Sequence, residues 1–171
     1  MEASYDYSKP TSANYACPDA RLRREFLSSR AGLDYRFHTR YTLERQALQD
    51  NIIRSMLSFE DMQTGRPEAQ SRWVRGVRGN SRSLLQPRQP WCIFTAGAMG
   101  AGKTHVMIGL HRHGLLPLPR FVRVDIDRIR ALLPETEGYD PRVAGQMTQR
   151  EASTIAEVVS EEALLLSLIH I

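Results

Sequence analysis

Cysteine, lysine and long apolar runs are all scarce in this 171-residue sequence. The two cysteines, Cys17 and Cys92, have neither the spacing of a zinc ribbon nor the density of a disulfide framework. We therefore expect a reducing compartment, the cytoplasm. No run approaches about 18 apolar residues, so no membrane-spanning segment is expected. The first residues also lack an apolar run, so we expect no secretory signal.

Charge is nearly balanced, with 23 basic and 19 acidic residues and a net charge of +4. All but two of the basic residues are arginines, and they are spread along the chain rather than clustered. Such a small net charge does not favour nucleic acid as a partner. The hydrophobic fraction of 42% and the charged fraction of 25% are typical of a globular domain and exclude a collagen or a chain disordered throughout.

Apolar periodicity and turn-forming residues divide the chain into four parts. Residues 1–18 lack periodicity and predict a disordered tail. Residues 19–64 predict a helical extension, with a short helix over 19–29 and a longer one over 42–58 that Thr42 would cap and whose apolar residues form one stripe. Glycine, proline, serine and arginine dominate residues 65–90, which predict a linker. Residues 91–171 form the fourth part.

Strands and helices alternate in this fourth part. The predicted elements are a buried strand at 91–96, a helix at 103–110, a strand at 121–125, a short helix at 127–133 and a longer helix at 148–166. Thr148 and Glu151 have the spacing of a capping box for the last helix. This order predicts an α/β fold in which helices cover both faces of a parallel sheet, giving three layers.

A glycine-rich segment joins the first predicted strand to its helix. The motif G-x-x-x-x-G-K-[ST] is satisfied by Gly97, Ala98, Met99, Gly100, Ala101, Gly102, Lys103 and Thr104. Glycines let the backbone wrap around a phosphate, so that N–H groups and the helix N-terminus face it. Lys103 would then bridge the β- and γ-phosphates, and the Thr104 hydroxyl would hold Mg²⁺. The sequence therefore predicts a nucleoside triphosphate site.

Two aspartates follow the second predicted strand. Asp125 and Asp127 would lie at the carboxyl end of the sheet, where ligands bind in α/β folds. If the chain stays extended through Asp127, both carboxylates project on the same side. A carboxylate there can take the proton of an acceptor hydroxyl, which would make the site a kinase of a small alcohol. We expect Asp127 and Lys103 to be catalytic, and Asp125 and Arg128 to bind substrate, with Arg130 a further candidate for steadying its phosphate.

A purely structural role for the same residues stays open. Asp127 would cap the helix that begins at Arg128, and Asp125 would accept a hydrogen bond from Thr104 or water. The arginines would then be ordinary surface residues of that helix.

These motifs together resemble the zeta toxin family of P-loop kinases, particularly its eukaryotic members. The likeness is carried by residues 94–105, 124–130, 133–135 and 148–157. It implies a nucleotide-kinase-like P-loop fold, binding of ATP, and Asp127 as the base, because the second aspartate of the family's D-x-D element falls there. Bacterial relatives phosphorylate a hydroxyl of UDP-N-acetylglucosamine. We therefore expect an ATP-dependent phosphotransferase whose acceptor is a small-molecule hydroxyl, with a UDP-sugar as a candidate.

The sequence departs from the family after the last predicted helix. Family members continue into a strand with an acidic residue and then an arginine-bearing lid, whereas residues 166–171 resemble a translated sequencing adaptor. We expect a truncated domain with an incomplete sheet and no activity as it stands. Three alternatives stay open: an adenylylsulfate kinase, a polynucleotide 5′-kinase, and an ATP-binding regulatory domain without catalysis.

Overall fold

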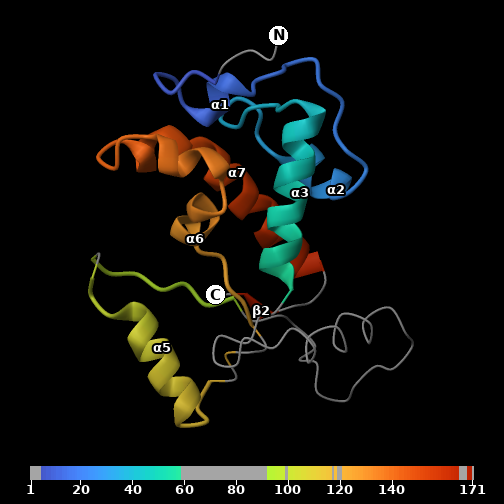
Figure 1. Cartoon of the computed structure of the whole chain (residues 1–171). Helices are drawn as coiled ribbons and strands as arrows, with labels where there is room; N and C mark the ends of the chain where they lie inside the picture. The colour runs from blue at the N-terminus through green and yellow to red at the C-terminus, as the bar shows by residue number, and fades with distance from the viewer. Residues whose placement is uncertain are drawn as a thin grey trace. The chain divides into compact units, whose positions relative to one another are not determined.

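The computed structural model in Figure 1 describes residues 5–58, 92–98, 100–116, 118 and 121–165, together with the backbone of 169–170. The chain divides into two compact units. The first unit contains residues 1–55 and 125–162, and the second contains residues 56–124 and 163–171. Each unit is described by itself. The predicted linker at 65–90 and Trp91 lie outside the described residues.

The first unit consists of helices. These are α1 (Thr11–Asn14), α2 (Leu27–Gly32), α3 (Leu43–Leu57), α6 (Ile126–Ala131), the 3₁₀-helix η3 (Pro134–Gly138) and α7 (Ala144–Leu165). The last residues of α3 and of α7 belong to the second unit. Helices α3 and α7 are the longest of the described helices (Figure 1). Side-chain hydrogen bonds from Arg45 and Gln49 of α3 to Glu151 of α7 join them. Both helices carry buried apolar residues, each at most 6% exposed: Ile52 and Ile53 on α3, and Ala152, Ile155, Val158 and Val159 on α7. The core of this unit is therefore built on one face of α7, as expected for an amphipathic helix.

The prediction of a helix at 42–58 is confirmed by α3. The Thr42 hydroxyl accepts a hydrogen bond from the Arg45 backbone N–H at 3.3 Å and so caps its first turn. The predicted apolar stripe is wrong in one respect, because Leu43 is 45% exposed. Its place in the interior is taken by polar residues, namely Arg45, Gln46, Gln49 and Asp50.

Burial of this polar face is possible because its groups have partners. The Arg30 guanidinium donates to the Asp50 carboxylate at 2.7 Å and to the Gln49 side-chain oxygen at 2.9 Å. The Gln46 amide donates to the Tyr41 carbonyl at 2.8 Å. A buried polar group that keeps its hydrogen bonds avoids most of the desolvation cost. Hydropathy therefore identified the apolar part of the buried face of α3, Ile52, Ile53 and Met56, and missed its polar part.

The prediction of a disordered tail at 1–18 is wrong from Tyr5 onward. The Tyr15 hydroxyl donates to the Glu135 carboxylate at 2.6 Å, and the Tyr139 hydroxyl donates to the Lys9 carbonyl at 2.8 Å. The Tyr5 and Tyr139 hydroxyls are also hydrogen-bonded to each other. Tyrosine supplies both an apolar ring and a polar tip, so a segment without periodicity can still pack.

The helix predicted at 19–29 begins only at Leu27, as α2. Phe26 precedes it with φ of 55°, a left-handed conformation that no residue inside an α-helix adopts. The chain before it therefore runs without helix.

The predicted capping box at Thr148 is also wrong, because α7 begins one turn earlier, at Ala144. The carbonyl of Asp140 accepts from the backbone N–H groups of Val143 and Ala144, which starts the helix before Thr148 is reached. The Thr148 hydroxyl donates back to the Ala144 carbonyl at 2.7 Å, and Glu151 is wholly buried. Glu151 therefore serves a tertiary contact instead of a cap.

The second unit contains helix α5 (Lys103–Arg112) and two short strands, β1 (Phe121–Val122) and β2 (Ile169–His170). The helix predicted at 103–110 is confirmed. β1 and β2 pair in parallel, with Phe121 opposite Ile169 and Val122 opposite His170. A parallel pair suits the predicted α/β class, and the strand predicted at 121–125 forms over its first two residues.

Of the strand predicted at 91–96, the described residues keep one β-bridge residue, Cys92, and residues 93–96 belong to no strand. Residues 93–96 have no strand hydrogen bonds, and the Phe94 side chain is 85% exposed. A strand is stable only beside a hydrogen-bonded neighbour, and the two strands of the described residues pair with each other. The described ranges therefore contain a two-stranded parallel sheet and not the predicted three layers. Within these ranges, no helix has the length and apolar character needed to cross a membrane.

The burial pattern of α3 generates a stability prediction. We expect Ile53→Ala to lower the free energy of unfolding by about 2–5 kcal/mol, because Ile53 is fully buried and truncation leaves a cavity. Leu43→Ala, in the same helix but exposed, should change it by less than about 0.5 kcal/mol. Urea denaturation of the two variants measures both values. Equal losses would contradict the burial assigned to α3.

Candidate nucleotide-binding site

The glycine-rich segment folds into a loop that needs its glycines. Gly97, Gly100 and Gly102 have φ values of 148°, 75° and 76°. Side chains disfavour these conformations by roughly 1–2 kcal/mol, whereas glycine adopts them freely. The motif therefore matches the backbone that this sequence adopts. Met99 lies outside the described residues.

Helix α5 begins directly after this loop. Gly102 is its N-cap residue and, having no side chain, supplies no side-chain cap to the first turn. The first four N–H groups of a helix have no partner within it, and the helix dipole places partial positive charge at the same end. This end of α5 can therefore bind an anionic group such as a phosphate.

Lys103 lies across the loop. Its ammonium group donates to the Gly97 carbonyl at 2.8 Å and to the Ala98 carbonyl at 2.9 Å. The loop itself is tied by a hydrogen bond from the Ala101 N–H to the same Ala98 carbonyl at 3.2 Å. These are exposed contacts between neutral acceptors and a cation, so a phosphate can compete for the lysine.

Thr104, the next residue, has a partner that the sequence did not suggest. The Arg123 guanidinium donates to the Thr104 hydroxyl oxygen at 3.3 Å. In the sequence, Arg123 stands out only as a charge that interrupts an apolar strand. Its contact places a second cation beside the start of α5.

The two aspartates belong to the first unit and have different environments. Asp125 is the N-cap of α6, and its carboxylate accepts from the N–H groups of Asp127 and Arg128 at 3.0 and 3.3 Å. The chain turns into α6 at Ile126, so it does not remain extended through Asp127. The two carboxylates therefore do not project together from a strand, and the cap is Asp125 rather than Asp127.

Asp127 keeps its carboxylate in solvent. Its side chain is 79% exposed, and Arg130, one turn later, donates to it at 2.6 Å. Arg130 also donates to the Gln149 side chain on α7. Asp127, Arg128 and Arg130 are thus brought together at α6, in a different unit from the loop.

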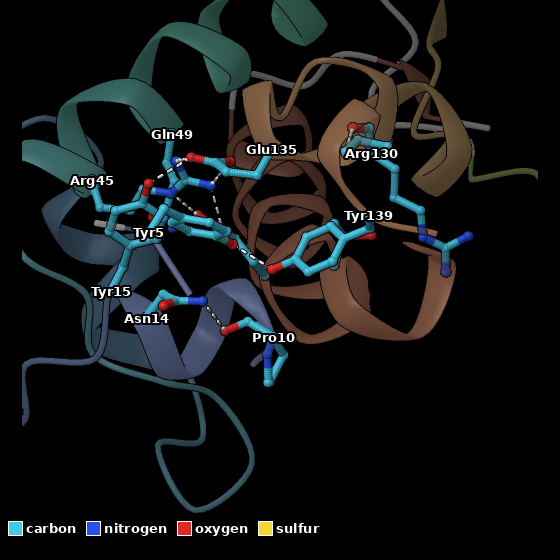
Figure 2. Close-up of polar contacts among 12 residues, drawn as sticks. Tyr5, Pro10, Asn14, Tyr15, Arg45, Gln49, Arg130, Glu135 and Tyr139 are labelled. Carbon is cyan, nitrogen blue, oxygen red and sulfur yellow. Dashed lines mark hydrogen bonds and ion pairs between the residues drawn. The ribbon is translucent and has the colours of Figure 1, made fainter. Parts of the chain in front are cut away.

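Sequence reasoning missed a buried cluster in the first unit, made of Arg45, Gln49, Glu135 and Glu151 (Figure 2). Burial raises the pKa of Glu135, but the Arg45 guanidinium and the Tyr15 hydroxyl outweigh that effect and hold its pKa below the ordinary value. Burial also raises the pKa of Tyr15, to about 12. The one signal in the sequence is that the polar residues at 45, 46, 49 and 50 repeat with helical spacing.

A glycine-dependent loop that leads into an uncapped helix and carries a lysine defines a P-loop nucleotide-binding protein. The zeta toxin family model matches residues 77–165, 89 of the 171 residues, so the chain belongs to the zeta toxin family. This family has a P-loop kinase fold and kinase-like activity, and membership implies binding of ATP. The match includes the loop, α6 and η3, while α1 to α3 precede it. No curated protein and no solved structure matches the chain.

The loop geometry generates a second prediction. We expect Gly102→Ala to weaken ATP binding, because alanine at a φ of 76° is strained by about 1–2 kcal/mol. Gly109→Ala adds the same methyl group to the interior of α5, where nothing lies within 4 Å, and should leave binding unchanged while stabilising the helix by up to about 1 kcal/mol. Calorimetric titration with ATP and Mg²⁺ compares the two. Equal affinities would show that the loop conformation does not matter for binding.

Proposed function

We propose that this protein transfers the γ-phosphoryl group of ATP to a hydroxyl of a small molecule. We expect the chain as it stands to bind ATP weakly and to show no sustained turnover, so transfer is tested below in a single turnover. The observation that carries the proposal is the loop at residues 97–104, with three glycines at positive φ leading into the uncapped α5. Membership of a P-loop kinase family supports it independently. We propose a UDP-sugar as the acceptor to test first.

The loop residues would hold the triphosphate. Backbone N–H groups of Gly97, Ala98, Met99, Gly100, Ala101, Gly102, Lys103 and Thr104 would surround it. The Lys103 ammonium would exchange its two carbonyl partners for β- and γ-phosphate oxygens, a stronger charge-assisted contact. The Thr104 hydroxyl would be a ligand of Mg²⁺, which neutralises developing charge on the phosphates when bound. The Arg123 guanidinium would then either give up its hydrogen bond to the Thr104 hydroxyl or contribute a second positive charge near the phosphates.

Asp127 would act as the base. It would take the hydroxyl proton as the acceptor oxygen bonds to the γ-phosphorus and the bond from that phosphorus to ADP breaks. Its exposure leaves the carboxylate accessible to an acceptor, and its contact with Arg130 orients it. Asp125 and Arg128 would bind the substrate, with Arg128 contacting the acceptor's phosphate. Asp125 also caps α6, because its Oδ1 accepts from the backbone N–H groups of Asp127 and Arg128.

The alternative class is an ATP-binding regulatory domain without catalysis. Such a domain would bind ATP with the same loop, and Asp127 would have a structural role alone. Its ion pair with Arg130 and its position in the first turn of α6 are compatible with that role too. Binding and transfer must therefore be measured separately.

Lys103→Ala should weaken ATP binding by about ten- to a hundredfold, because it removes a charge-assisted contact with phosphate. Lys9→Ala is the matched control. Lys9 is the other lysine of the chain and forms an exposed ion pair with Asp6. Calorimetric titration with ATP and Mg²⁺ gives both affinities. If both variants bind as the wild type does, the loop is not the nucleotide site.

Asp127→Asn should keep ATP affinity and slow transfer by about a hundredfold or more, because the amide cannot accept the hydroxyl proton. The control is Asp140→Asn, also an exposed carboxylate of the first unit. Transfer is followed in single turnover, with protein in excess over labelled ATP and UDP-N-acetylglucosamine as the acceptor. Transfer at the wild-type rate in Asp127→Asn would remove the base assignment, and binding without any transfer in the wild type would favour the regulatory alternative.

A further inference from the structure

Arg45 of α3 joins two parts of the first unit that are distant in sequence (Figure 2). Its guanidinium donates two hydrogen bonds to the Glu135 carboxylate of η3, both at 2.8 Å. It donates two more to Glu151 of α7, at 2.7 and 3.0 Å. The arginine side chain is 3% exposed, so both ion pairs are buried.

One guanidinium faces two carboxylates in this cluster, and neutral donors compensate. The Tyr15 hydroxyl donates to Glu135 at 2.6 Å, and the Gln49 amide donates to Glu151 at 2.8 Å. The Arg45 guanidinium also lies over the Tyr15 ring, 4.1 Å from its centre. Every side chain of the cluster is therefore held by more than one contact.

Buried ion pairs are a poor source of net stability, because desolvation offsets most of their attraction. They do fix the relative orientation of the paired side chains, because the planar guanidinium can donate two hydrogen bonds only to a carboxylate in a narrow range of orientations. The cluster is therefore better suited to fixing the orientation of η3 than to stabilising the fold in general.

A short series of contacts leads from Glu135 to Asp127. The Thr136 hydroxyl, next to Glu135, donates to the Arg130 carbonyl at the end of α6, at 2.6 Å. The Arg130 guanidinium in turn donates to the Asp127 carboxylate at 2.6 Å. Ile129 of α6 and Leu133, which directly precedes η3, are almost completely buried. Their burial leaves α6 and η3 little room to shift separately.

We propose that Arg45 is a positioning residue for Asp127, acting through Glu135 and η3. The catalytic part of this statement rests on the proposed function, whereas the ordering of α6 and η3 does not. On this proposal, residues before the zeta toxin match at 77–165 are part of the functional domain, because Arg45 orients a segment inside that match. The N-terminal extension is then not an independent module.

The test is Glu135→Gln in the full chain, with Glu137→Gln as the control. The substitution keeps the size of the side chain and removes its charge, and Glu137 lies in the same 3₁₀-helix with an exposed side chain. In Glu135→Gln, amide hydrogen exchange across residues 126–136 should be about tenfold faster, while exchange across α5 is unchanged. The single-turnover transfer rate should fall about tenfold or more, with ATP affinity within about twofold of the wild type. Glu137→Gln should match the wild type in every reading.

Wild-type exchange across residues 126–136 in Glu135→Gln would overturn the proposal. Faster exchange there with an unchanged transfer rate would overturn the positioning of Asp127. If Glu135→Gln loses cooperative thermal unfolding, Arg45→Lys is used in its place. Lysine keeps the positive charge but cannot donate two hydrogen bonds to one carboxylate in the manner of the guanidinium, and the same changes in exchange and transfer are expected. Hydrogen exchange is measured without nucleotide, so a wild type that transfers no phosphate contradicts the proposed function, while the exchange result still decides whether Arg45 orders α6 and η3.

Discussion

The first unit depends on one buried arginine that pairs with two carboxylates from different elements. Arg45 connects α3 to η3 and to α7, and so links the two stretches of the first unit, residues 1–55 and 125–162. A single cation cannot satisfy two buried carboxylates alone, so the cluster also requires Tyr15 and Gln49. This requirement accounts for the contact that ties Tyr15 of the N-terminal segment to η3 and for the burial of Arg45 and Gln49 on α3.

The second unit depends on a different constraint, the left-handed backbone of the glycine-rich loop. Positive φ at Gly97, Gly100 and Gly102 shapes the turn, and the N-terminus of α5 follows it without a side-chain cap. Neither feature depends on packing, since α5 has no buried residue. The conformation of the loop therefore rests on local backbone preferences, which is why a short motif predicts where its glycines are needed.

Local features were predictable from the sequence, and tertiary ones were not. The loop glycines, α5 and the Thr42 cap follow from residues within a few positions of one another, so motif and spacing were sufficient. The capping box at Thr148 failed because Asp140 starts α7 earlier and Glu151 is used by a residue 106 positions away. The Arg45–Glu151 contact depends on three-dimensional neighbours that hydropathy does not reveal. The disposition of Asp125 and Asp127 failed for a local reason, because Asp125 caps α6 and the chain turns into the helix at Ile126.

The most direct test of the central claim, that the loop at residues 97–104 holds a triphosphate, is amide hydrogen exchange of the full chain with and without ATP and Mg²⁺. We expect slower exchange at residues 100–106, where loop and helix N–H groups would bind phosphate oxygens, and unchanged exchange in the core of α7. Binding of ATP that protects another segment and leaves these residues unchanged would contradict it.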